Sequence, residues 1–446
     1  MILPPDVSAL LSRLHTAGFA AYAVGGCVRD SLRGATPADW DVTTAARPEQ
    51  VQALFADRRV VPTGLRHGTV AVLTGERTVE ITTFRVEGGY TDRRRPDEVR
   101  FVADVTADLR RRDFTVNAMA YSDEEGLLDP FGGQADLAAG CLRCVGDPRA
   151  RFEEDALRIL RGLRFAATLG LSPEAETSRA LHAERELLHS VAAERVAAEL
   201  TRLLCGDHVL PVLRDYRDVV AVVLPELVPT FDLDQRNPHH LYDVYLHILH
   251  TVAAAPAEPW LRWAALLHDI GKPACFTTDE HGVGHFYGHP AVSAQIARQV
   301  LTRLRMDHET VCSVSELVEY HDRPIAPTPS AVKRVLGRIG ETQFRRLLAL
   351  KRADSAAHAV TADSRFADLD EVERLLDEVL REAACFSLRD LAVKGNDLTA
   401  IGVPEGPAVG KLLRRLLDAV MDEQCPNDRE ALLKLAGEFL GNEGAR

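Results

Sequence analysis

The sequence predicts an α+β fold, in which a region with short strands precedes a longer helical region. Residues 1–145 contain short apolar runs with alternating polarity, separated by glycine turns, which is typical of strands. From residue 151 onward, apolar residues recur at the three- and four-residue spacing of helices. A chain of 446 residues suits about two to four domains. We expect a head at 1–145, a helical neck at 146–210, a helical body at 211–360 and a helical tail at 361–446.

The expected elements follow the chain in order. Residues 6–18 should form an amphipathic helix, because Val7, Leu10, Leu11 and Leu14 share one face. In the rest of the head we expect a strand at 22–24, a glycine turn, a helix to residue 32, a strand at 39–43, a helix at 48–55, a strand hairpin at 67–74 and 78–85, a loop at 86–98, a helix at 110–121 and a short strand at 142–146. Residues 151–208 should be almost wholly helical, and further helices are expected around His247 and at 266–273, 369–379, 410–421 and 428–440, with a break at 396–406.

Composition limits the function classes. The net charge of −13 argues against a broadly basic nucleic-acid-binding surface, although residues 90–112 carry seven arginines against five acids. No run of about 18 apolar residues and no basic-then-apolar leader is present, so we expect a soluble, cytoplasmic protein without a membrane partner. Eight scattered cysteines in so long a chain suit reduced thiols better than a disulfide framework.

A glycine turn and a pair of carboxylates stand out near the N-terminus. Gly25 and Gly26 follow an apolar strand and open a helix, where backbone N–H groups can bind an anion, and Arg29 adds a charged fork for phosphate oxygens. Asp39 and Asp41 are two residues apart, so both carboxylates face the same side of a strand. Adjacent carboxylate oxygens of this kind suit Mg²⁺ held together with substrate phosphates.

Other polar residues of the head and neck are weaker candidates. Glu80 alternates with two apolar neighbours, which makes it either a third metal carboxylate or part of the solvated face of a sheet. Arg112 and Asn117 could reach a triphosphate or a ribose. Asp155 and Arg158 are three residues apart on one face of an expected helix, a spacing that ordinary surface ion pairs also have.

Histidines are concentrated in the expected body, where eleven of the 16 lie between His239 and His358. Their order is His247 in an apolar helix, then the pair His268-Asp269, then His289, His321 and finally Asp354. Single helical histidines are usually core residues with satisfied hydrogen bonds. Imidazole and carboxylate groups in one cluster would instead suit a divalent metal ion.

The ordered motifs resemble the class II tRNA nucleotidyltransferases, that is, the bacterial CCA-adding enzymes and the related poly(A) polymerases. The resemblance is carried by Gly25-Gly26-Cys27-Val28-Arg29-Asp30, then Asp39-Trp40-Asp41, then Arg111-Arg112-Asp113-Phe114-Thr115-Val116-Asn117-Ala118. It implies a polymerase-β-like head and two-metal transfer of nucleotides from CTP and ATP to the acceptor end of tRNA by a monomer or homodimer, with the tail holding the acceptor arm.

The resemblance also implies roles for single residues. Asp39 and Asp41 would hold Mg²⁺, and Asp155 and Arg158, with Arg161 nearby, would form hydrogen bonds to the incoming base and so select C or A without a template. Arg195 is expected to brace the neck. The stretch Arg95-Pro96-Asp97 is similar to the flexible element that the family needs to add A after CC, which favours addition of CCA or of A.

The histidine pattern resembles the HD superfamily of metal-dependent phosphohydrolases. The resemblance implies that His247, His268, Asp269 and Asp354 bind one divalent metal, which could be Mn²⁺, Ni²⁺, Fe²⁺ or Mg²⁺, and that His289 and His321 could hold a second one. Such a metal lowers the pKa of a bound water and makes it a nucleophile for phosphoester cleavage.

Three alternatives remain open from the sequence. The protein could be a poly(A) polymerase or an enzyme that adds only A. It could be a phosphohydrolase whose head merely binds RNA. The histidine-rich region could also be a structural scaffold without metal.

Overall fold

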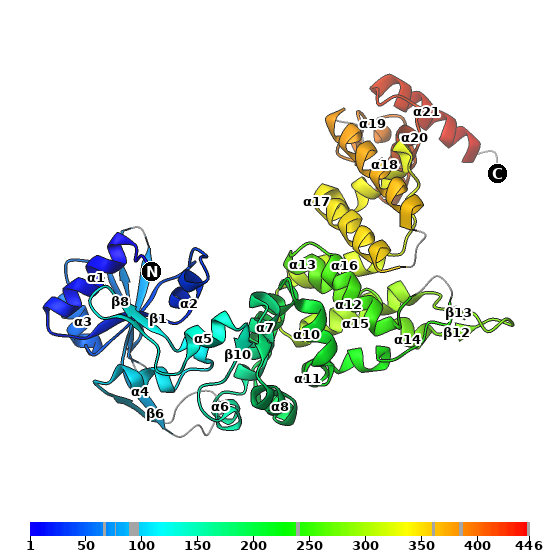
Figure 1. Cartoon of the computed structure of the whole chain (residues 1–446). Helices are drawn as coiled ribbons and strands as arrows, with labels where there is room; N and C mark the ends of the chain where they lie inside the picture. The colour runs from blue at the N-terminus through cyan, green and yellow to red at the C-terminus, as the bar shows by residue number, and fades with distance from the viewer. Residues whose placement is uncertain are drawn as a thin grey trace. The chain divides into compact units, whose positions relative to one another are not determined.

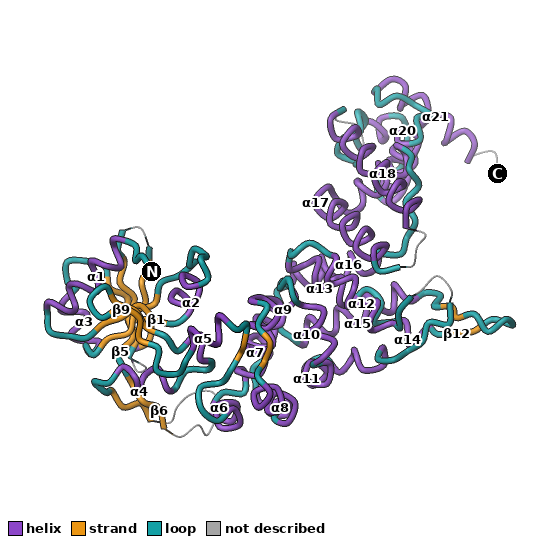
Figure 2. The backbone as a smooth tube through the Cα atoms, in the orientation of Figure 1, coloured by secondary structure: helices purple, strands orange, loops and turns teal. Residues whose placement is uncertain are grey.

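The computed structural model describes residues 1–65, 68–75, 77–88, 98–237, 241–358, 362–382 and 387–443. The chain forms two compact units. The first contains Met1–Val228 and Arg303–Met306, and the second contains Pro229–Thr302 and Asp307–Arg446. Figures 1 and 2 show that strands are concentrated in the first part of the chain and helices in the remainder, as an α+β fold requires. The predicted fold class is confirmed.

A seven-stranded mixed sheet forms the centre of the head (Figure 1). Its strand order is β3-β4-β5-β2-β1-β8-β9, and among these pairs only β2 and β5 run parallel. The strands are β1 (Ala21–Val24), β2 (Asp41–Thr44), β3 (Val60–Gly64), β4 (Thr69–Leu73), β5 (Thr78–Thr83), β8 (Ala120–Ser122) and β9 (Gly126–Leu128). The expected hairpin of two strands joined near Gly75 is confirmed as β4 and β5.

Helices cover this sheet, and β1 shows how both faces are buried. Ala21 and Ala23 join one apolar cluster, with α1 and α3, whereas Tyr22 and Val24 join another on the opposite face. The period of two follows from the pleat of a strand. The further elements of the head are α1 (Pro5–Thr16), α2 (Gly26–Leu32), α3 (Pro48–Leu54), α4 (Val105–Arg110), η2 (Thr115–Asn117), α5 (Gly133–Ala138) and the antiparallel pair β6 (Arg85–Gly88) and β7 (Glu98–Phe101).

The expectation of one helix over 110–121 is wrong. Helix α4 ends at Arg110, and the segment that follows pairs with other parts of the chain. Thr115 N–H donates to the Arg143 carbonyl oxygen, Val145 N–H donates to that of Asp113, and Ala120 pairs with Val24 inside the sheet. Backbone pairing in the tertiary structure has therefore overridden the helical spacing of Phe114, Ala118 and Tyr121.

The loop expected at 86–98 is also shorter than predicted, because both of its ends belong to strands. Its flanks form β6 and β7, and Val86 pairs with Arg100 across them. The stretch Arg95-Pro96-Asp97 lies outside the described residues.

Helices dominate the neck, as expected. In α7 an apolar face packs against α9, and Gly162 lies so close to the Phe114 ring that an added Cβ would approach it to 3.2 Å. The elements are β10 (Cys141–Leu142), α6 (Pro148–Glu154), α7 (Leu157–Leu169), β11 (Ser172–Pro173), α8 (Ala175–Ala183), η3 (Arg185–Ser190), α9 (Ala193–Leu204), α10 (Val209–Asp215), α11 (Arg217–Val223) and η4 (Pro225–Thr230). The strand expected at 142–146 is limited to β10, which pairs with β11.

The second unit is built almost wholly from helices. They are α12 (Val244–Ala254), α13 (Pro259–Leu267), α14 (Lys272–Cys275), α15 (His289–Arg303), α16 (His308–Tyr320), α17 (Pro329–Ala356), α18 (Ala362–Arg381), α19 (Gly395–Ala400), α20 (Pro407–Met421) and α21 (Arg429–Glu443), with the short pair β12 (Thr277–Thr278) and β13 (Gly284–His285). The prediction that 266–273 is one helix is wrong, because α13 ends at Leu267 and residues 268–271 form a turn. Helix α17 is kinked at Gly340, whose φ is 76°.

Two small apolar cores lie in the C-terminal part of this unit. One joins α17 to α18, and the other joins α19, α20 and α21. The predicted tail helices are therefore confirmed, although α19 occupies part of the expected break at 396–406. Across the described ranges, no helix has the length and apolar character that a membrane crossing needs. The seven cysteines in those ranges are all free.

Candidate active site and a second candidate metal centre

At the turn after β1, the backbone lies in close contact with a cationic side chain. Gly25 has φ of 81°, a conformation that favours glycine, and it immediately precedes α2. A Cβ at this position would lie 2.8 Å from Arg112 Nη1. Arg112 Nε is buried and has no hydrogen-bond partner in the described structure, and burial lowers the pKa of Arg112. A desolvated guanidinium with unused donors is suited to an anionic ligand at this turn.

Replacing Gly25 by alanine is expected to raise the KM for CTP, a substrate that the resemblance implies, about tenfold or more, because the new methyl group displaces the Arg112 guanidinium. Gly34→Ala is a matched control: Gly34 has φ of 75° and no atom within 4 Å of an added Cβ. Steady-state kinetics with CTP would measure the effect. Equal changes in the two variants would mean that backbone strain alone acts.

Three carboxylates lie on or just before the neighbouring central strands β2 and β5 of the sheet. Asp41 and Glu80 are direct partners in the parallel pair β2–β5, and both point away from the buried Val42, Val79 and Ile81. Asp39 lies in the loop just before β2. Glu80 is exposed, so the expectation that it points opposite to its apolar neighbours is confirmed.

Charge crowding is visible at Asp41. Although its side chain reaches solvent, partial burial raises the pKa of Asp41; the Arg112 charge opposes this rise, and the Glu80 and Asp39 charges add to it. None of the three acids forms an ion pair with a described residue, and their oxygen ligands suit Mg²⁺. The donor set therefore fits a divalent cation.

A chain of hydrogen bonds runs behind the glycine turn. Arg29 is buried and donates from Nη1 to Asn117 Oδ1 at 2.6 Å, while Nε and Nη2 contact Asp30. Asn117 Nδ2 lies 3.3 Å from Asp113 Oδ1, and Arg161 Nε donates to Asp113 Oδ2 at 2.9 Å. Arg29, Asn117 and Arg161 are thus held in one network; their contacts to nucleotide stay predictions.

Asp113 is the buried carboxyl group of this network, and a low pH should weaken the network. Burial by itself raises the pKa of Asp113, but the Arg161 charge and hydrogen bond outweigh burial and hold that pKa well below its usual value. A carboxyl whose pKa is depressed in the folded state adds stability above its unfolded pKa of about 3.9, and this stability is lost as the pH falls.

We therefore expect Asp113→Asn to cost roughly 2–3 kcal/mol at pH 7 and about 1 kcal/mol less at pH 3, which lies below the unfolded pKa of the carboxyl. The urea midpoint of the wild type and the variant at both pH values would test this. Asp123→Asn, at an exposed acid that accepts from Ser8 Oγ, is the control and should shift the midpoint little. A midpoint difference independent of pH would contradict the assignment.

The predicted base-selecting pair lies at a break between helices. Asp155 has φ of −139° and ψ of 102°, so α6 ends there and the expected continuous helical face is wrong. Its carboxylate contacts Arg195 Nη2 at 3.0 Å and accepts from Leu157 N–H at 3.1 Å. Arg158 donates to Glu154 Oε2 at 2.6 Å and to the Arg111 carbonyl oxygen at 2.8 Å. Arg195, which we expected to brace the neck, forms an ion pair with Asp155.

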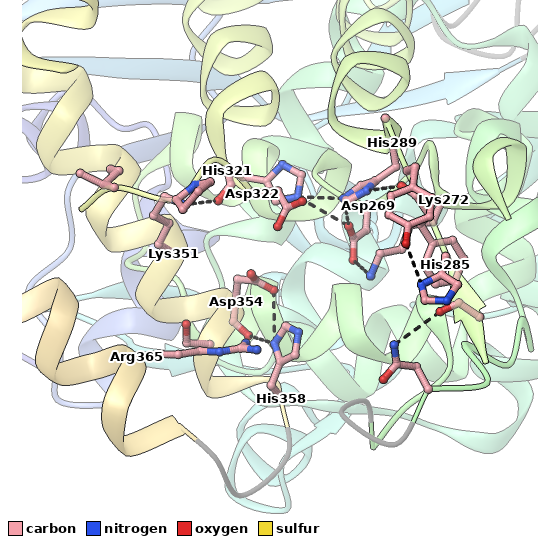
Figure 3. A pocket seen from close by; sticks show the side chains of 18 of the residues that line it. Asp269, Lys272, His285, His289, His321, Asp322, Lys351, Asp354, His358 and Arg365 are labelled. Atoms are coloured by element: carbon pink, nitrogen blue, oxygen red, sulfur yellow. Dashed lines mark hydrogen bonds and ion pairs between the residues drawn. The ribbon is translucent and has the colours of Figure 1, made fainter. Parts of the chain in front are cut away.

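The structure brings together all six body residues that the sequence singled out. We call them the histidine–aspartate cluster: His247 on α12, His268 and Asp269 after α13, His289 on α15, His321 after α16 and Asp354 on α17. Figure 3 shows Asp269, His289 and His321 pointing toward one another. Ligand atoms lie within 4.8 Å of one another in two sets, one of His247, His268 and Asp354 and one of His268, Asp269 and His321.

Hydrogen bonds orient every imidazole of the cluster toward its centre. Each Nδ1 faces a backbone carbonyl oxygen, that of Ala357, Ala265, Phe286 and Val318 for His247, His268, His289 and His321, respectively. An Nδ1–H that donates to a carbonyl leaves Nε2 as a lone-pair donor to metal. Facing Nε2 atoms are 3.3 Å apart in two pairs, His247 with His268 and His289 with His321. Two lone pairs at this distance repel unless a proton or a metal ion lies between them, so the geometry is compatible with a bound metal ion.

Electrostatics favour a neutral imidazole at two of the four histidines of the cluster. Burial lowers the pKa of His247 and of His321, which suits a metal ligand. Burial raises the pKa of Asp269, but the charges of His268 and Lys272 outweigh it and lower that pKa; for Asp354, the hydrogen bond with His247 is the largest effect that lowers the pKa against burial. For His268, burial lowers the pKa and the Asp269 carboxylate more than offsets it, so the pKa of His268 is raised.

A cavity of about 620 Å³ opens onto the cluster. Asp269, His289, His321 and Asp354 line it from the cluster side. Lys272 is also on its wall, with Nζ 2.7 Å from Asp269 Oδ2 and 2.9 Å from Gln235 Oε1. No role was expected for Lys272 or Asp113. Lys272 directly follows His268-Asp269-Ile270-Gly271, and Asp113 lies within the Arg111–Ala118 motif, so a charged residue in or beside each motif was the available signal.

Sequence comparisons cover the same regions. Residues 21–143 match the profile of the poly A polymerase head domain, 170–229 that of a probable RNA and SrmB-binding site of polymerase A, and 289–436 that of a putative tRNA nucleotidyltransferase domain 2. A CCA-adding enzyme of Leuconostoc mesenteroides is 32% identical over 98% of this chain and 97% of its own length. The chain belongs to the family of CCA-adding enzymes. The resemblance drawn from the motifs is confirmed.

Other members of the CCA-adding family match equally fully. The enzyme of Levilactobacillus brevis is 34% identical over 95% of both chains. A crystal structure of the Bacillus stearothermophilus CCA-adding enzyme in complex with CTP superimposes with a TM-score of 0.76, at 27% identity and with both chains covered completely.

Proposed function

We propose that this protein adds C, C and A to the 3′ end of tRNA, using CTP and ATP without a nucleic-acid template. One observation in this member of the CCA-adding family carries the proposal. The Asp41 and Glu80 carboxylates, which form no ion pair with a described residue, lie near Arg112, whose buried Nε has no hydrogen-bond partner there and whose Nη1 lies against the Gly25 turn. The names of the full-length relatives support CCA addition over poly(A) synthesis.

In this mechanism Asp39 and Asp41, with Glu80 beside them, would hold Mg²⁺. Bound Mg²⁺ supplies charge neutralisation for the triphosphate and lowers the pKa of the attacking hydroxyl group. Arg112 and the backbone at Gly25 and Gly26 bind the phosphates. The 3′ oxygen of the tRNA forms a bond to the α-phosphorus, and the bond from that phosphorus to pyrophosphate breaks.

Base choice would fall to Asp155 and Arg158. A carboxylate has about four lone-pair sites, so Arg195 and Leu157 N–H occupy only part of the Asp155 acceptor capacity while they fix its orientation. Glu154 and the Arg111 carbonyl oxygen orient Arg158. An oriented acceptor and donor could form hydrogen bonds to the base edge of the incoming nucleotide.

Incorporation of labelled CTP and ATP into tRNA transcripts that end before C, after CC and after CCA tests the proposal. Ordered addition that stops at CCA is the expected result. Extension with ATP alone would instead assign A addition, or poly(A) synthesis if it does not stop. Absence of incorporation would contradict nucleotidyl transfer by this chain.

The histidine–aspartate cluster supports a second candidate function, a metal-dependent phosphohydrolase. The specific observation is the four imidazoles whose Nε2 atoms converge beside two ionised carboxylates. A divalent ion there would supply Lewis-acid activation of water. In the reaction, a water oxygen forms a bond to phosphorus, the phosphoester bond breaks, and the leaving oxygen takes up a proton. Metal analysis and phosphate release from nucleotides would test this function.

A further inference from the structure

An exposed aromatic pair lies at the rim of the cavity beside the cluster. The rings of His285 and Tyr287 are stacked with centroids 5.2 Å apart and planes 9° apart. Both residues line the cavity, yet Tyr287 is 79% exposed, the most exposed aromatic side chain among the large apolar residues at the described surface. We call His285 and Tyr287 the stacking pair. Burial of a tyrosine ring is favourable, so a ring left this exposed at the rim of a cavity is a candidate contact surface for a ligand.

Local hydrogen bonds hold the stacking pair in place. His285 Nε2 lies 3.0 Å from Asp279 Oδ2, and Asp279 also accepts from the N–H groups of His281 and Val283. The Tyr287 hydroxyl group lies 3.4 Å from His285 Nδ1. Strands β12 and β13 pair next to these residues. The ring faces are therefore positioned before any ligand arrives.

The chain connects the stacking pair directly to the cluster. Phe286, between the two aromatic residues, accepts through its carbonyl oxygen from His289 Nδ1 at 2.9 Å, and its ring lies 5.1 Å from Lys272 Nζ. Tyr287 therefore lies two residues before His289 and lines the same cavity as the cluster. In Figure 3, His285 lies on the Lys272 side of the cavity and Arg365 on the opposite rim.

The cavity is larger than a phosphate group needs. Its volume of about 620 Å³ lies in the ordinary range of small-molecule sites. Flat aromatic faces beside a phosphate site match nucleobases, which stack on tyrosine and histidine in a manner that tolerates different bases. Aliphatic phosphoesters have no group that would use such a surface.

We propose that His285 and Tyr287 form a nucleobase-stacking subsite at the rim of this cavity. The stacked base belongs either to a free nucleotide or to the terminal nucleotide of an RNA. The inference rests on the proposed phosphohydrolase only for the placement of phosphate at the cluster. Binding tests the subsite, and phosphate release tests the hydrolase, so the two can fail separately.

The test compares ligands that differ only in the base. Calorimetric titration of the Mn²⁺-loaded protein with adenosine 5′-monophosphate and with ribose 5-phosphate gives the preference for the base. We expect about a tenfold preference in the wild type, near the lower part of the range for one stacked base. Tyr287→Ala should reduce this preference severalfold, and Tyr287→Phe, which retains the ring, should restore it.

Ile401→Ala provides a matched control, because Ile401 is also an exposed apolar residue of this unit but does not line the cavity. It should leave the base preference unchanged. A Tyr287→Ala variant that keeps the full preference for the base would overturn the proposal, as would a loss of preference that Tyr287→Phe does not restore.

A second arm separates the two sources of the ligand. A short single-stranded oligoribonucleotide with a 3′-phosphate is compared with the same strand whose last nucleotide lacks its base. Tyr287-dependent preference for the base with the mononucleotide alone identifies free nucleotides, and with the oligonucleotide alone it identifies RNA ends. Absence of such a preference with both ligands overturns the subsite.

Discussion

Replacement of Asp41 by asparagine is expected to lower the rate of CMP incorporation into tRNA about a thousandfold. The side chain keeps its shape but loses the charge that would hold Mg²⁺ next to Glu80 on β5, and metal stabilisation of the developing charge is worth several kcal/mol. Asp39→Ala should likewise abolish transfer. Nucleotide binding should stay measurable in both variants, because Arg112 and the Gly25 turn are intact.

Single-turnover incorporation of labelled CTP, together with equilibrium CTP binding, would measure this split between chemistry and binding. Asp57→Asn is a matched control in the same head, since Asp57 forms an exposed ion pair with Arg13. The control should retain the wild-type rate. An Asp41→Asn enzyme with a rate within a few fold of the wild type would refute the metal assignment.

The second large effect is expected at the cluster of the other unit. Asp269→Asn should remove most of the bound metal and reduce phosphate release from nucleotides about a thousandfold, because Asp269 lies within 3.2 Å of both His268 Nε2 and His289 Nε2. Ordered addition to tRNA should stay within about threefold of the wild type, because the two activities are assigned to different residues. Metal content by plasma emission spectrometry and phosphate release by a colorimetric assay give the two readouts.

A second variant, Asp354→Asn, keeps the test valid if Asp269→Asn fails to fold. Asp354 lies on a different helix, α17, and its carboxylate is 2.9 Å from His247 Nε2. Asp370→Asn removes an acid that pairs with Arg352 on the exposed surface of α18 and should change neither readout. Absence of stoichiometric metal from the wild-type protein would favour the alternative of a structural scaffold, and full metal content in both cluster variants would mean that the metal is bound elsewhere.

Residue pattern alone predicted those parts of the fold in which local and tertiary preferences agree. Helices α1 and α3 and the β4–β5 hairpin follow from apolar spacing and from turn residues such as Gly75. The 110–121 segment shows where this reasoning fails. Its apolar residues have helical spacing, but the free energy of completing the sheet at Ala120 and of pairing Thr115 with Arg143 exceeds the small intrinsic preference for helix.

The candidate sites divide in the same way. Sequence identified Asp39 and Asp41 and all six residues of the histidine–aspartate cluster by type and order, because metal chemistry restricts which side chains can serve. It could not tell that Arg29 donates to Asn117, or that Asp155 is paired with Arg195, because partners far apart in the chain leave no local pattern.

The sequence by itself determined the family, the α+β architecture and which groups are proposed to do the chemistry. Tertiary structure alone decided how those groups are oriented: which carbonyl oxygen fixes each imidazole, which glycine lies against Arg112, and which acid faces Asp41 across β2 and β5. The physical reason is that residue type sets what a side chain can bind, whereas packing and hydrogen bonding between distant segments set where its atoms point.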